Sequence, residues 1–139
     1  MTLTQIEFVP SALKILGASS HPSLGRAMEI MLRAVSFGEV DIVLPVDVCK
    51  QATEMKPDFV LFTPEYLTCT IQEKLEIGCP CKEKKWCKNA LILMLLKEPN
   101  VESVFTSKDM GFDSIIFADA SVEKMYLILE RAYLHHHRI

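Results

Sequence analysis

Two kinds of hydrophobic pattern alternate along the chain. Five short runs are almost wholly apolar, which predicts strands at residues 14–18, 41–45, 58–63, 90–96 and 114–117. Between these runs, apolar residues recur every three or four positions. This spacing predicts helices at residues 22–34, 46–55, 65–77, 101–110 and 121–133. Continuous apolar strands joined by helices favour a doubly wound α/β fold with a five-stranded parallel sheet and helices on both faces.

Residues at the ends of the predicted helices support these boundaries. Pro22 stands where a helix can begin, and Ser121 is a suitable cap for the last helix. Gly78 and Gly111 follow the third and fourth helices at the position where glycine commonly ends a helix. Cys49 falls within the second helix and is expected in the core.

Length and charge narrow the classes of protein. The 139 residues suit one domain, which we assign to residues 1–139 with a core at 14–134. A net charge of −3 argues against nucleic-acid binding. The apolar runs are shorter than the roughly 20 residues of a membrane span, and no secretion signal begins the sequence. We therefore expect no membrane contact and a cytoplasmic location.

Four segments make the chain resemble the receiver domain of two-component response regulators. They are KILGASSHPSLGRAMEIMLRA (14–34), KPDFVLFT (56–63), ALILMLL (90–96) and MGFDSIIFADAS (110–121). The resemblance implies a flavodoxin-like sheet of strand order 2-1-3-4-5. It also implies five phosphorylation-site positions, which are occupied here by Ser19 and Ser20 (acidic pair), Thr63 (aspartate acceptor), Leu96 (hydroxyl) and Ala118 (lysine).

These residues lack the chemistry of aspartyl phosphorylation. Mg²⁺ is held by carboxylates, which Ser19 and Ser20 do not supply. The Thr63 hydroxyl is a poor nucleophile without a base, and Ala118 brings no charge. We therefore expect a pseudo-receiver that is not an enzyme. The resemblance implies that its helices at 101–110 and 121–133 contact a protein partner or a second copy.

A cluster of cysteines lies where receivers have a shorter connection. Cys79, Cys81 and Cys87 stand in the predicted inserted loop at 77–88, and Cys69 stands on the preceding helix. If the loop folds back along that helix, four thiolates would suit Zn²⁺ or an iron–sulfur cluster. A reversible disulfide that senses redox state, or a buried Cys69 with exposed loop thiols, are the alternatives.

A further alternative is a cofactor-binding domain of the same architecture, such as a cobalamin domain. That family carries Asp-x-His-x-x-Gly after the first strand. This chain has Ser at the Asp position and one residue too many before Gly25, and no Gly-Gly follows the fourth strand. His21 could contact a ligand at this edge, but a role in the turn before the first helix is favoured.

Overall fold

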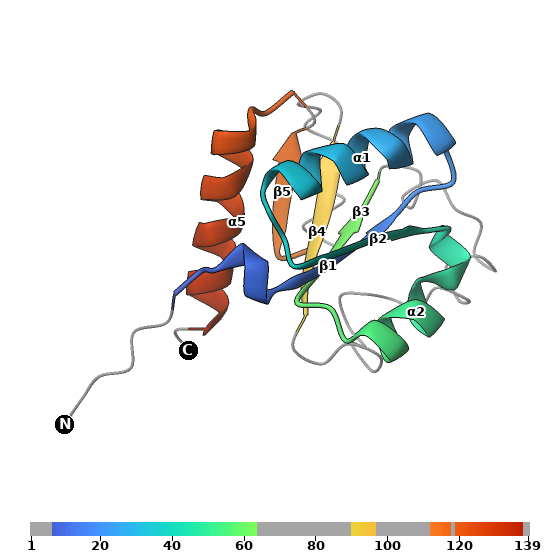
Figure 1. Cartoon of the computed structure of the whole chain (residues 1–139), viewed down its shortest axis with the longest axis horizontal. Helices are drawn as coiled ribbons and strands as arrows, with labels where there is room; N and C mark the ends of the chain where they lie inside the picture. Colours follow the sequence, from blue (N-terminus) through green and yellow to red (C-terminus); the bar gives the residue numbers. More distant parts are fainter. Residues whose placement is uncertain (1–6, 64–89, 97–111, 118, 138–139) are drawn as a thin grey trace.

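The computed structural model describes residues 7–63, 90–96, 112–117 and 119–137. Five parallel strands form one sheet in the order β2-β1-β3-β4-β5 (Figure 1). The strands are β1 (Lys14–Ala18), β2 (Glu39–Val43), β3 (Phe59–Phe62), β4 (Leu91–Leu96) and β5 (Ser114–Phe117). The described helices are α1 (Pro22–Ala34), α2 (Val48–Met55) and α5 (Val122–His137), with 3₁₀ turns η1 (Pro10–Ala12) and η2 (Pro45–Asp47). The strand order predicted from the receiver resemblance is confirmed.

Most predicted boundaries hold, although the last helix, expected at 121–133, runs on to His137. The second strand also differs. It was expected at residues 41–45 but runs from Glu39 to Val43, because Pro45 has no N–H for a ladder and begins η2 instead. Cys49 was expected in the core, yet it is only partly buried. The buried face of α2 consists of Val48, Ala52 and Met55, and position 49 lies beside it. The helices predicted at 65–77 and 101–110 lie outside the described residues.

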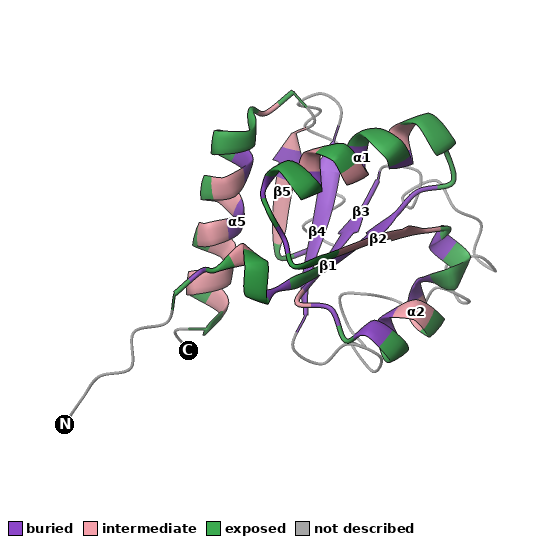
Figure 2. Ribbon diagram, in the orientation of Figure 1, coloured by how far each residue is buried: buried purple, intermediate pink, exposed green. Residues whose placement is uncertain are grey.

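The sheet separates two apolar layers, and Figure 2 shows that its central strands are buried. On one face, α1 and α5 cover strand residues such as Ile15, Phe59 and Leu93. On the other face, α2 covers the alternate residues, such as Leu16 and Val60. All four residues of β3 and all six of β4 are buried, as central parallel strands require. No helix among the described residues is long and apolar enough to cross a membrane.

Aromatic rings close the layer beneath α1 and α5. Phe59 lies among three rings at centroid distances of 5.6 Å to Phe37, 6.1 Å to Tyr133 and 6.2 Å to Phe8. Phe8 also packs edge-on against Tyr126 at 5.1 Å. Burial raises the pKa of Tyr133, and the negative charge of Asp58 raises it further. The cluster therefore joins the first described residues and α5 to the centre of the sheet.

Two aspartates tie neighbouring strands together at the amino-terminal edge of the sheet. The Asp58 carboxylate accepts a 2.9 Å hydrogen bond from the backbone N–H of Lys14, and the Asp113 carboxylate accepts one of 2.7 Å from Ile92. The backbone N–H of each aspartate donates back to the carbonyl of the same residue, at 2.9 and 2.7 Å. These aspartates therefore have a structural role at the edge opposite to the expected functional site.

Candidate functional site

The sheet register brings the predicted phosphorylation-site positions to one edge. Ala18 is paired with Phe62, and these are the last residues of β1 and β3. Ser19 and Thr63, which come next on the two strands, therefore lie side by side. Phe62 is paired with Met94, which places the last residue of β4, Leu96, on the same edge. Ligands of open parallel sheets bind at this edge, near the point where the strand order reverses between β1 and β3. Ala118 lies outside the described residues.

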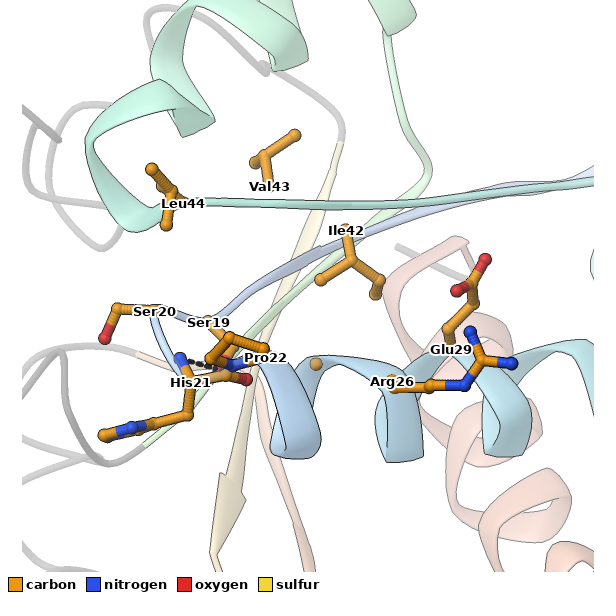
Figure 3. A pocket seen from close by; sticks show the side chains of 10 residues that line it. Ser19, Ser20, His21, Pro22, Arg26, Glu29, Ile42, Val43 and Leu44 are labelled. Atoms are coloured by element: carbon orange, nitrogen blue, oxygen red, sulfur yellow. Dashed lines mark hydrogen bonds between the residues drawn. The ribbon is translucent and has the colours of Figure 1, made fainter.

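The Ser19 side chain stabilises the turn that leads into α1. It is buried, and its hydroxyl accepts a 3.1 Å hydrogen bond from the backbone N–H of His21 and donates to the carbonyl of the same residue at 3.3 Å (Figure 3). The carbonyl of His21 also accepts from Gly25 at 2.8 Å and so begins α1. His21 is the cap residue of this helix, and its ring is exposed to solvent. The turn role expected for His21 is confirmed by this geometry.

Thr63 and Leu96 are closed off from solvent. Thr63 is 1% exposed, and its hydroxyl contacts the backbone carbonyl of Ala18 at 3.5 Å. Leu96 is 2% exposed and packs in the layer beneath α2 with Phe62 and Val43. The Thr63 hydroxyl is therefore almost inaccessible to a molecule in solution.

An open depression of about 390 Å³ lies beside this edge, between α1 and the end of β2. Ser19, Ser20 and His21 form one end of it, and Ile42, Val43 and Leu44 line its side along the outer strand (Figure 3). Thr63 and Leu96 are not among its lining residues. The described depression is therefore displaced from the reversal between β1 and β3 toward the free edge of the sheet. Sequence reasoning did not indicate it, since its α1 side is formed by residues with no distinctive pattern.

The charged residues of this depression come from one flank of α1. Arg26 and Glu29 both line it, one turn apart on the helix. Glu29 binds Arg33 at 3.0 Å, which is the usual i,i+4 pair of a helix surface. Among the described residues, no carboxylate pairs with Arg26. The positive charge of Arg26 is therefore available to a ligand.

The predicted metal-ligating residues lie outside the described residues. This applies to Cys69, Cys79, Cys81 and Cys87, so the zinc, iron–sulfur and redox hypotheses stay predictions. Within the part of the chain that the structure describes, no three His, Cys, Asp or Glu side chains gather in a way that could hold a metal ion.

The sequence matches no protein-family model and no curated protein sequence. Solved structures do match. Chemotaxis protein CheY4 of Vibrio cholerae has a TM-score of 0.68 at 17% identity over 87% of this chain and 98% of that chain. This chain has a receiver-like fold. A protein from Burkholderia pseudomallei described as pilus assembly-related has a TM-score of 0.70 at 13% identity, over 93% and 95% of the two chains.

A third solved structure is an atypical orphan response regulator described as having a phosphorylation-independent regulatory mechanism. It has a TM-score of 0.58 at 17% identity and covers 88% of this chain and 96% of that chain. At these identities the likeness concerns the fold, and the function of this chain has to be argued from its own residues.

Proposed function

We propose that this protein is a pseudo-receiver, a signalling and protein-interaction module that works without aspartyl phosphorylation and without catalysis of its own. The observation that carries the proposal is the carboxyl edge of β1, β3 and β4. Ser19 is engaged in the turn before α1, Thr63 is buried, and Leu96 is part of the apolar core. A site built in this way offers neither carboxylates for Mg²⁺ nor a carboxylate nucleophile. The clustered thiols favour a cytoplasmic location.

The proposal predicts that a small phosphoryl donor leaves the protein unmodified. Incubation with acetyl phosphate and Mg²⁺ is expected to give no mass increase of about 80 Da, the mass of one phosphoryl group, by intact-protein mass spectrometry. A receiver domain with an intact site, treated in parallel, provides the positive control. A stoichiometric adduct on this chain, at Thr63 or elsewhere, would overturn the proposal.

Support for a partner surface comes from α5. Leu127 is 50% exposed on this helix and Val122 is 43% exposed, while Met125 and Leu129 face the core. The second helix of the surface implied by the receiver resemblance, at 101–110, lies outside the described residues. We propose that α5 contributes apolar contacts to a protein partner or a second copy, because the buried centre of a protein interface is more apolar than its rim.

The cysteine cluster adds a separate hypothesis, that the segment 69–87 holds a metal or senses redox state. Protein purified without oxygen is expected to contain zinc, or iron with sulfide, in a fixed ratio to the chain. The double change Cys79→Ser and Cys81→Ser removes two ligands and should abolish the metal. Cys49→Ser is the matched control, since Cys49 lies on α2 and outside the cluster. If metal is absent and no thiol oxidises reversibly, the cysteines have no such role. An absorption spectrum of the same sample tests the cobalamin alternative.

A further inference from the structure

The outer edge of β2 has backbone N–H and C=O groups that are not paired with another strand among the described residues. β2 ends the strand order and is paired with β1 alone. The N–H of Glu39 donates to the carbonyl of Leu13, and the carbonyl of Val43 accepts from Ser19, so these two residues face β1. Because successive residues of a strand face opposite sides, Val40 and Ile42 direct their N–H and C=O groups away from the sheet.

The depression beside this edge combines apolar surface with two charged side chains of α1, Arg26 and Glu29, of which Glu29 is paired with Arg33. Leu44 is 50% exposed at its rim, and the nearby Val46 is 45% exposed. Arg26 faces the same space from α1, and no carboxylate of the described residues pairs with it. The volume of about 390 Å³ falls within the size range of ligand sites, and the open side continues along the strand.

We propose that the edge of β2 binds an extended acidic peptide segment of a partner protein as an added strand. Main-chain hydrogen bonds to Val40 and Ile42 would hold the peptide, as in other sheets that accept an extra strand. A carboxylate of the peptide, on the α1 side, would pair with Arg26. The proposed peptide site is a different surface from α5. It rests on the proposed function only in assuming that the protein acts by binding another protein.

The two faces of β2 set different requirements for alternate side chains of the peptide. On the α1 side lie Ile42, Arg26 and Glu29. Because Glu29 is paired with Arg33, an apolar side chain would be accepted by Ile42 and an acidic one by Arg26. On the α2 side lies Asp41, whose carboxylate accepts a 2.8 Å hydrogen bond from Gln51. A second acidic side chain there would be repelled, so acidic residues are expected on one face of the peptide only.

The same acidic residue argues against a second copy of the chain as the occupant. A two-fold antiparallel pairing that uses both Val40 and Ile42 is centred on Asp41. It would place the Asp41 carboxylates of both copies opposite each other, and like charges in that arrangement are destabilising. A peptide of different sequence has no such restriction.

The test begins with selection of short random peptides displayed on phage against the full chain. Enriched sequences are expected to alternate, with a carboxylate on one face and apolar or basic residues on the other. Affinity of a synthetic enriched peptide should fall about tenfold on Arg26→Glu, and should recover when the peptide acid is exchanged for lysine. Lys56→Glu, at the end of α2 and away from the depression, is the charge-matched control and should leave affinity unchanged.

Amide hydrogen exchange tests the added strand without a further variant. Bound peptide should slow exchange at Val40 and Ile42, whose N–H groups face outward. The proposal is overturned by failure to enrich peptides, by affinity that is indifferent to Arg26→Glu, or by unchanged exchange at these two amides. It is also overturned if sedimentation shows a dimer in which exchange at Val40 and Ile42 is already slow without peptide. None of these results bears on phosphorylation, so the peptide-binding proposal and the pseudo-receiver proposal can be contradicted independently.

Discussion

Replacing Phe59 with Ala is expected to lower the free energy of unfolding by about 3–5 kcal/mol, the usual cost of deleting a buried aromatic ring. Phe59 is fully buried on β3, and its ring lies among those of Phe8, Phe37 and Tyr133. Its partners come from three separate segments of the chain, so a cavity there cannot close without moving all three. Urea unfolding followed by circular dichroism measures the change.

A conservative variant separates the loss of volume from the loss of the ring. Phe59→Leu keeps most of the apolar volume and should cost less than half as much as Phe59→Ala. If Phe59→Ala costs less than about 1 kcal/mol, the aromatic cluster does not hold this layer together, because so small a loss is typical of surface positions.

Replacing Gly38 with Ala is the second change with a large expected effect. A Cβ at this position would overlap the backbone carbonyl oxygen of Ser11, which has no rotamer by which to move away. The Gly38 N–H also donates to the carbonyls of Pro10 at 2.9 Å and Leu13 at 3.0 Å, so the segment cannot simply shift outward. We expect a loss near the upper end of the roughly 1–3 kcal/mol that overpacking costs.

Gly17→Ala is the matched control for this prediction. Its Cβ would also be close to other atoms, at 2.6 Å from Cδ1 of Ile42 and 3.0 Å from Cε of Met28. Both atoms are ends of flexible side chains, which can rotate, so the loss of unfolding free energy should be smaller than for Gly38→Ala. Equal losses of unfolding free energy for the two variants in the same urea experiment would contradict the argument that the rigid Ser11 carbonyl causes the larger loss.

The carboxyl ends of β1 and β3 show how much a residue pattern can predict. The sequence shows that Ser19 and Thr63 lack the carboxylates of a receiver site, because that is a matter of side-chain chemistry alone. It does not show that the Ser19 hydroxyl is engaged with the backbone of His21, nor that Thr63 is 1% exposed. Those facts depend on how β1 and β3 lie beside each other in the sheet.

The aspartates of the opposite edge illustrate the same limit. The sequence places Asp58 and Asp113 in two segments of the receiver resemblance, but it indicates no hydrogen-bond partner for either carboxylate. Their hydrogen-bond partners, Lys14 and Ile92, are 44 and 21 residues away in the chain. Local propensity contains no information on contacts at such separations, since they form only when the strands take their order in the sheet.

The sequence by itself determined the fold class. Apolar runs of strand length that alternate with helical spacing allow few arrangements other than a covered parallel sheet, because each element has to bury its apolar face. It also determined which chemistry is missing at Ser19, Ser20 and Thr63. The tertiary structure alone decided that an open depression lies between α1 and β2, with Arg26 and Glu29 among its lining residues. That site depends on the packing of two elements that are each ordinary in sequence, and only their juxtaposition creates it.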